Sequence, residues 1–172
     1  MEMIAMVLAA ALQTAPVTPA APPPKINCSD ADHRGFDFWI GDWDVVPTGS
    51  KTVIAHSRIK KIAGCAISET YDQTVGPGGK PMDYHGRSIS TFVPAAGNWQ
   101  QFYVDSGGTV AHLTGGVVNG AMVFQSTVGT ATNRMTLNRN ADGSVRQQGE
   151  TSTDGKTWHS TFDFTYRPRP TQ

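Results

Sequence analysis

This sequence has no excess charge of one sign and no long hydrophobic run. Lys plus Arg and Asp plus Glu are equal at 14 each, so the chain has no net charge that would attract nucleic acid or anionic lipid. The apolar stretch within residues 1–15 is too short to span a bilayer. We therefore expect no nucleic-acid partner and no membrane span, and a chain of 172 residues predicts a single domain.

Motifs that would identify a metal site or a known catalytic centre are also missing. The five histidines and two cysteines show no spacing typical of metal ligands. No Gly-x-Ser-x-Gly elbow occurs, and the glycine-rich segment 76–79 lacks the Lys-Ser/Thr pair of a phosphate-binding loop. The sequence thus predicts no metal and no bound cofactor.

The N-terminal part of the chain predicts export. Residues 1–15 form an apolar run that ends in a small-x-small step at Ala15, as in a secretory signal peptide. Glu2 and the lack of Lys or Arg depart from the usual basic start, so a plain N-terminal helix is the alternative. Residues 16–26 are rich in Pro and Ala and predict an extended linker. We expect a folded domain over 27–172 and a periplasmic or secreted protein.

Cysteine is scarce, but the count is even. Cys28 stands at the start of the expected domain and Cys65 lies in a strand pattern. In an exported protein such a pair favours a disulfide, which would close a loop of about 38 residues and stabilise the fold by about 3–4 kcal/mol. Two unpaired cysteines are the alternative.

Most of the chain after residue 42 alternates with a period of two, as strands do. Turn sequences such as Asn119-Gly120 and Asp142-Gly143 separate the runs and favour hairpins. Consecutive hairpins predict an antiparallel meander of about ten strands. Closure into an up-and-down barrel would leave no unpaired edge strand. A two-sheet sandwich is the alternative. The expected strands are 43–46, 52–62, 65–72, 85–93, 99–105, 109–115, 121–127, 133–138, 144–152 and 158–167.

Residues 29–40 have a different pattern. A capping residue is followed by Phe36, Trp39 and Ile40 at helical spacing. We expect a short helix there that covers one end of the barrel.

The segment 36–45, Phe-Asp-Phe-Trp-Ile-Gly-Asp-Trp-Asp-Val, carries a resemblance. The chain resembles a family of exported calycin-like hypothetical proteins of proteobacteria, which begin with Phe-Asp-Phe-Trp-x-Gly-x-Trp-Asp-Val. That family is similar to lipocalins and nitrobindin-type haem proteins, which share a Gly-x-Trp matched here by Gly41 and Trp43. The resemblance implies a lipocalin-like barrel closed at its floor by the indole of Trp43, and it implies no established activity. Further matching segments are 64–69, 99–105, 119–123, 143–147 and 152–158.

Candidate ligand-binding residues come from strand parity. Trp99, Gln101 and Tyr103 share one strand face, and Glu69 shares another with Tyr71. Aromatic rings around a few polar groups suit a ligand cavity. A solvated outer face with cross-strand pairs is the alternative, because parity does not show which face points inward. The complete candidate set is Trp43, Glu69, Tyr71, Arg87, Trp99, Gln101 and Tyr103.

Histidines offer a second kind of site. A nitrobindin-like barrel would need one imidazole to hold haem, and His85 and His112 are the candidates in strand patterns. Ordinary surface histidines are the alternative, and they are favoured because no motif supports haem.

Two classes of function remain. The first is an exported barrel that binds a small, largely apolar molecule of unknown identity. The second is a cofactor-independent lyase, isomerase or cyclase in which Glu69 or His85 removes a proton and Tyr103 or Arg87 stabilises the developing oxyanion. A buried carboxyl group with a strongly raised pKa would favour the enzyme, and a cavity lined only by rings and aliphatic groups would favour the binding protein. A barrel filled by its own side chains is a third possibility.

Overall fold

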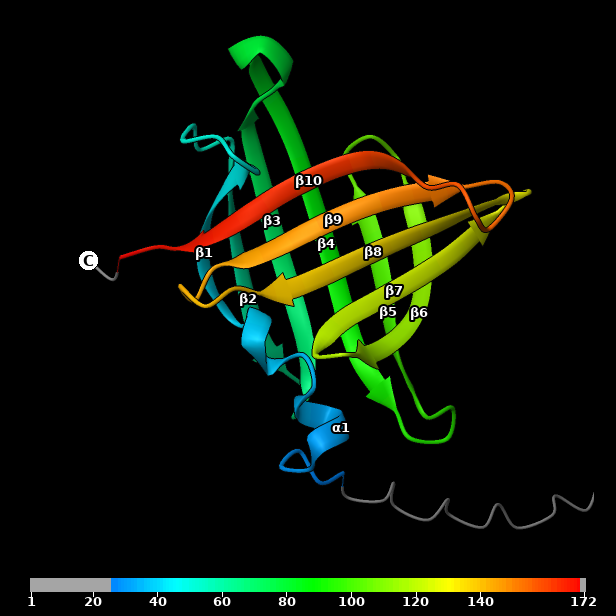
Figure 1. Ribbon diagram of the computed structural model, residues 1–172. Coiled ribbons are helices and arrows are strands. Elements are labelled where there is room, and N and C mark those ends of the chain that lie inside the picture. Colours follow the sequence, from blue (N-terminus) through cyan, green and yellow to red (C-terminus); the bar gives the residue numbers. More distant parts are fainter. Residues whose placement is uncertain (1–25, 171–172) are drawn as a thin grey trace, which may run out of the picture.

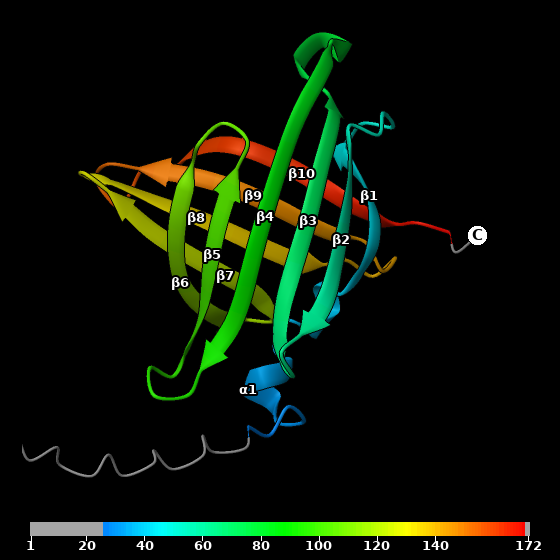
Figure 2. The ribbon, with the colours of Figure 1, turned by 180° about the vertical axis from the view of Figure 1, so that it is seen from behind.

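The protein is a closed antiparallel barrel of ten strands (Figures 1 and 2). The computed structural model describes residues 26–170. The expected signal peptide and nearly all of the expected linker lie outside these residues. In the order around the barrel, each strand pairs with its neighbours along the chain, and β1 pairs with β10. The strands are β1 Gly41–Pro47, β2 Ala55–Ile62, β3 Ala66–Val75, β4 Pro81–Val93, β5 Asn98–Asp105, β6 Val110–Val118, β7 Ala121–Val128, β8 Ala131–Arg139, β9 Val145–Ser152 and β10 His159–Pro168.

Closure removes the sheet edges, as the strand pattern predicted. Val45 on β1 is paired with Ala55 on β2 and with Tyr166 on β10, so both sides of the first strand are occupied. The two-sheet sandwich is thereby excluded. The predicted hairpins are also present. Between β6 and β7, Asn119 and Gly120 have φ angles of 51° and 83°, the positive values that a two-residue turn of a twisted hairpin requires.

One end of the barrel is covered by two short helical segments where we expected one helix (Figure 1). The α-helix α1 spans Ala31–Arg34, and the 3₁₀ segment η1 spans Asp37–Trp39. Asp30 caps α1 by accepting a hydrogen bond from the backbone N–H of His33. The chain turns at Gly35, where a Cβ atom would lie 2.8 Å from a methyl carbon of Val117. The backbone leaves the helical conformation at the next residue, Phe36, with φ −114° and ψ 8°, and this residue separates α1 from η1.

Large aromatic side chains fill this closed end. The indole N–H of Trp43 donates to the carbonyl oxygen of Trp39 over 3.0 Å, and the indole N–H of Trp99 donates to the carbonyl oxygen of Asp32 over 3.0 Å. Phe36, fully buried, stacks on Trp39 with ring centroids 4.9 Å apart. The two indoles thus fasten the helical segments to the barrel floor.

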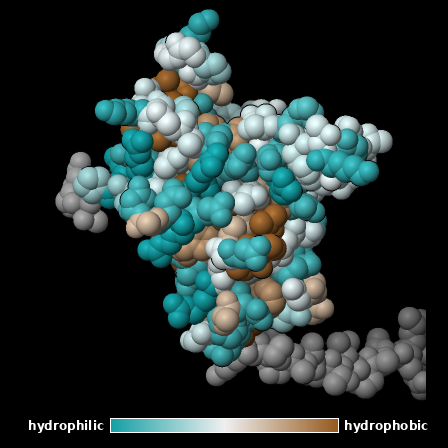
Figure 3. Space-filling view, viewed as in Figure 1, coloured by the Kyte–Doolittle hydropathy of each residue, from teal (hydrophilic) through white to brown (hydrophobic). Residues whose placement is uncertain are grey.

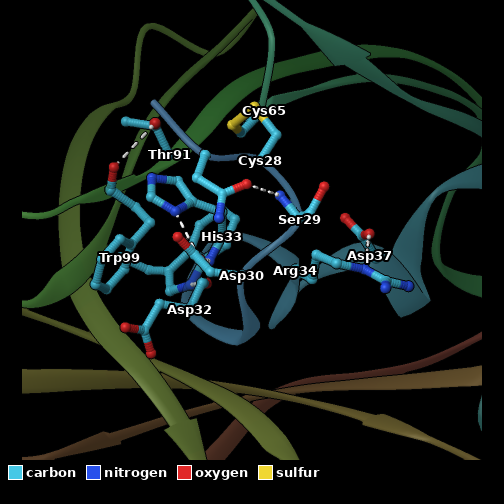
Figure 4. A network of polar contacts seen from close by, with 12 residues as sticks. Cys28, Ser29, Asp30, Asp32, His33, Arg34, Asp37, Cys65, Thr91 and Trp99 are labelled. Atoms are coloured by element: carbon cyan, nitrogen blue, oxygen red, sulfur yellow. Dashed lines mark hydrogen bonds and ion pairs between the residues drawn. A yellow bond between two sulfur atoms is a disulfide. The ribbon is translucent and has the colours of Figure 1, made fainter. Parts of the chain in front are cut away.

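The two cysteines form the disulfide that the sequence predicts. Cys28 precedes α1 and Cys65 lies in the turn between β2 and β3, with Cα atoms 5.3 Å apart. The disulfide connects the start of the domain with the closed end of the barrel (Figure 4).

None of the helices in residues 26–170 is long and apolar enough to cross a membrane.

The end opposite α1 is open and uneven. The β3–β4 hairpin, with the 3₁₀ segment η2 Pro77–Gly79 at its tip, extends well beyond the other strands (Figures 1 and 2). The outer face seen in Figure 3 is mostly hydrophilic or intermediate, with hydrophobic colour confined to small patches.

Candidate functional site

The barrel encloses a cavity of about 480 Å³ that lies above the aromatic floor. On β3, β5 and β10 the lining begins at Glu69, Gln101 and Tyr166 and continues toward the strand ends opposite α1. Ile67 and Trp99, one inward position deeper on β3 and β5, belong to the packed core instead. The barrel is therefore filled at one end and hollow at the other. The lining residues are Glu69, Tyr71, Gln73, Met82, Tyr84, Gln101, Tyr103, Thr109, Ala111, Leu113, Ser126, Asn133, Arg134, Met135, Gln147, Gly149, Glu150, Thr161, Phe162, Phe164 and Tyr166.

All four tyrosines of the sequence line this cavity: Tyr71, Tyr84, Tyr103 and Tyr166. The rings of Tyr71 and Tyr84 meet edge to face with centroids 6.2 Å apart. Burial raises the pKa of each phenol above its ordinary value, so the hydroxyl groups stay neutral at physiological pH. They offer the cavity hydrogen-bonding groups on large apolar rings.

Glu69 is a carboxyl group at the inner end of the cavity. Its side chain points inward from β3 and the residue is only 7% exposed. Three hydroxyl groups surround it: Ser57 donates to Oε1 over 3.0 Å, Ser88 donates to Oε2 over 3.2 Å, and the Tyr166 hydroxyl lies 3.3 Å from Oε1. Ser57 and Ser88 come from β2 and β4, the strands on either side of β3, whereas Tyr166 comes from β10 and reaches Glu69 only because the barrel closes.

The surroundings raise the pKa of Glu69 to about 7. Burial is the main cause, because it removes water from the charged form. The hydrogen bonds from Ser57, Ser88 and Tyr166, together with the positive charge of Arg87, lower the pKa but only partly oppose this effect. Protonated and ionised forms of Glu69 therefore coexist near neutral pH.

Other polar groups of the lining are held by partners. The Tyr166 hydroxyl donates to Gln147 Oε1 over 2.7 Å, and the Gln101 amide donates to Ser90 Oγ over 3.0 Å. The hydroxyl groups of Tyr84 and Tyr103 are hydrogen-bonded to each other, and that of Tyr84 also donates to Asp105 over 2.8 Å. This network fixes the orientation of the rings.

At the mouth, two charged residues neutralise each other. Arg134 on β8 forms a salt bridge of 2.8 Å with Glu150 on β9, and its guanidinium group lies 3.9 Å over the ring of Trp158. Nearby, Phe162 occupies the space next to Gly149, where any Cβ atom would overlap the Phe162 ring. Because Gly149 has no side chain, the Phe162 ring can pack against it in the cavity wall.

The structure separates the predicted ligand-binding residues into two groups. Glu69, Tyr71, Gln101 and Tyr103 lie together in the cavity wall. The other three lie elsewhere: Trp43 and Trp99 pack in the closed end, and Arg87 is on the outer face.

The placement of Arg87 corrects its assignment as a cavity residue. Its guanidinium group donates to the carbonyl oxygen of Tyr71 over 2.8 Å and pairs with Asp72 over 2.9 Å. Residues at even positions from Tyr84 to Ser90 on β4 face inward, so Arg87 faces outward because of strand alternation. Arg87 affects Glu69 through its charge and has no place in the wall.

Both histidines considered for haem or proton transfer also lie outside the barrel. His85 pairs with Asp72 over 2.6 Å and is 47% exposed. His112 stacks on Phe102 with ring centroids 4.5 Å apart, and it is exposed. Neither imidazole reaches the cavity, so the structure gives no axial ligand for haem at these positions. Among residues 26–170, no three His, Cys, Asp or Glu side chains cluster as a metal site would require.

Ser57, Ser88 and Tyr166 were not predicted from the sequence as partners of Glu69. A signal for Tyr166 was present, because Phe162, Phe164 and Tyr166 alternate on one strand face. The two serines gave no such signal in the sequence, because serines are common in strands and their role depends on which residues face them.

Comparisons with known proteins do not assign the chain to a family. No protein-family model matches the chain, and no curated protein matches it in sequence.

Proposed function

We propose that the protein binds a small, largely apolar molecule inside the barrel. The observation that supports this function is the cavity of about 480 Å³ with an aromatic wall and a few polar groups at its inner end. Its size falls in the range of small-molecule sites, about 300–1,000 Å³, and such sites combine apolar walls with a few oriented polar groups.

The aromatic and the polar residues of the cavity wall would contact different parts of the ligand. Tyr71, Tyr103 and Phe164 supply large rings for contact with an apolar body. Glu69 and Gln101 lie at the inner end, where they can orient a polar group of the ligand. Binding of this kind needs no metal or cofactor.

We propose that the protein acts in the periplasm or outside the cell. The Cys28–Cys65 disulfide supports this location, because disulfides persist in oxidising compartments. Membership of the exported calycin-like family, proposed from the segment 36–45, agrees with the closed barrel.

The binding function can be tested by native mass spectrometry of protein purified from the periplasm, followed by organic extraction. We expect a retained small molecule. Ala111→Phe would place a ring in the cavity and abolish retention, whereas Val110→Phe adds the same ring at an outward position that is 81% exposed. Equal retention by both variants would contradict binding in this cavity.

Proton transfer is a second candidate function, and one observation favours it. Glu69 has a pKa of about 7 and faces a cavity large enough for a substrate, which suits a general base near neutral pH. With His85 outside and Glu150 paired with Arg134, Glu69 is the candidate base within the described cavity wall.

This second function can be tested on the molecule that the extraction yields. The molecule is incubated in D₂O with wild-type protein or with Glu69→Gln, and deuterium at carbon is measured by NMR. Exchange catalysed only by the wild type would support proton transfer, and equal rates with and without protein would exclude it for that molecule.

A further inference from the structure

The charges around the cavity differ between its two ends. Three charged residues line it: Glu69, Arg134 and Glu150. Arg134 and Glu150 pair with each other at the mouth. Glu69 has hydroxyl neighbours, but no Lys, Arg or His nitrogen in residues 26–170 lies within ion-pair distance of it. The inner end therefore carries a carboxyl group without a cationic partner.

Arg87, whose charge acts on Glu69 from outside the barrel, already has other partners. Arg87 bonds to a backbone carbonyl of β3 and pairs with Asp72. It points away from the cavity, so its guanidinium group cannot compensate the charge of Glu69 from within the wall. A buried carboxylate is costly unless cations or donors compensate it. The hydroxyl donors around Glu69 only partly offset the effect of burial, and a ligand can supply a cation.

The walls above Glu69 also suit a cation. Four tyrosine rings line the cavity together with Phe162 and Phe164, whose rings stack with centroids 5.5 Å apart. Aromatic faces attract ammonium groups, more strongly where water is excluded. Charge and ring lining thus favour the same kind of ligand.

We propose that the ligand is an organic amine, bound as its ammonium ion with the nitrogen donating to Glu69 and the apolar body between the tyrosine and phenylalanine rings. This inference rests on the proposed binding function and names the chemical class of its ligand. An organic anion would meet the carboxylate at the inner end without a free positive group in the wall. An uncharged apolar molecule would leave Glu69 without a cationic partner.

Binding of an amine is coupled to a proton on Glu69. When Glu69 is protonated, the ammonium ion displaces that proton to the solvent and the carboxylate–ammonium pair forms. Tyr71 on β3, Tyr84 on β4, Tyr103 on β5 and Tyr166 on β10 face the carboxyl group as neutral phenols, and Ser57 on β2 donates to it. The charge of Arg87 acts from the outer face. Burial raises the pKa of Glu69 to about 7, so proton release accompanies binding below neutral pH and fades above it.

The experiment is isothermal titration calorimetry with three ligands on one ring system: 2-(1-naphthyl)ethylamine, uncharged 1-propylnaphthalene and anionic 1-naphthylacetate. At pH 8 we expect the amine to bind at least about tenfold more tightly than the uncharged ligand, because hydrogen bonds to charged groups contribute more than neutral ones. Titrations at pH 6 in two buffers with different ionisation enthalpies should show release of about one proton per amine. The uncharged ligand should release none.

Two variants complete the test. Glu69→Gln should weaken amine binding at least about tenfold and leave 1-propylnaphthalene within about twofold. Asp83→Asn removes a carboxylate that is 93% exposed on the outside of β4 and should change neither affinity.

The outcomes distinguish this inference from the function on which it rests. If 1-propylnaphthalene or 1-naphthylacetate binds as tightly as the amine, the amine assignment is wrong while binding in the cavity stands. The same holds if no proton is released at pH 6, a measurement that needs no variant. If none of the three ligands binds to the wild type, both proposals fall.

Discussion

Replacing Glu69 by Gln is expected to stabilise the protein, and by an amount that depends on pH. The pKa of Glu69 is about 7 in the folded barrel, against an ordinary value of 4.5. Below pH 4.5 the carboxyl group is protonated in both folded and unfolded chains, so its titration has no effect on stability. Between pH 4.5 and about 7 the unfolded chain loses the proton while the folded protein keeps it, and stability falls as pH rises.

The size of this effect follows from the interval between the two pKa values. One pH unit corresponds to about 1.4 kcal/mol, so the interval from 4.5 to about 7 amounts to about 3 kcal/mol. Glutamine keeps the shape of Glu69 and stays uncharged. Its amide can accept a hydrogen bond from Ser57 and donate one to Ser88, which now lie 3.0 and 3.2 Å from the carboxyl oxygens.

The assay is urea unfolding of wild type and Glu69→Gln at pH 4.5, 6 and 8. The free energies of unfolding should be similar at the lowest pH, and the variant should be more stable by about 3 kcal/mol at pH 8. Groups such as His85 titrate in both proteins, so their contributions cancel in the difference. Asp83→Asn, the outer-face control, should follow the wild type. A difference between wild type and Glu69→Gln that stays constant from pH 4.5 to 8 would refute the argument.

Three further changes test the closed end and the cavity wall. Replacing both Cys28 and Cys65 by Ser should lower the free energy of unfolding in urea by about 3–4 kcal/mol, because a loop of about 38 residues is no longer closed; an equal loss on reducing the wild type would confirm the cause. Trp43→Phe should cost about 1–2 kcal/mol through loss of its hydrogen bond to η1, with ligand affinity unchanged, whereas a large loss of affinity would place Trp43 in the binding site. Gly149→Ala should push the Phe162 ring into the cavity and weaken ligand binding, measured by calorimetry, and unchanged affinity would show that the ring moves outward instead.

The sequence predicted the features of this protein that depend on local chemistry. Alternation with a period of two located all ten strands, and dipeptides such as Asn119-Gly120 located turns, because backbone conformation responds to nearby residues. The disulfide followed from an even cysteine count in a chain expected to be exported. Parity also grouped Gln101 with Tyr103 and Glu69 with Tyr71, and each pair shares a face.

Only the tertiary structure decided which faces point inward and how deep each residue lies. Alternation along a strand shows which residues share a face but not which face points inward. Arg87 and His85 therefore could not be placed on the outer side from their positions alone. Trp43 and Trp99 point inward but lie below the cavity, because the helical segments and the floor occupy that end. The close packing of Gly35 against Val117, on a distant strand, is likewise absent from any local pattern.

The properties of Glu69 likewise arise from long-range assembly. Tyr166 approaches its carboxyl group from 97 positions away in the sequence, while Ser57 and Ser88 approach from the two strands on either side. The pKa of Glu69 depends on the exclusion of water by the whole barrel, and no local pattern encodes that exclusion. Sequence thus determined the strands and their alternation, and closure of the barrel determined the chemistry inside it.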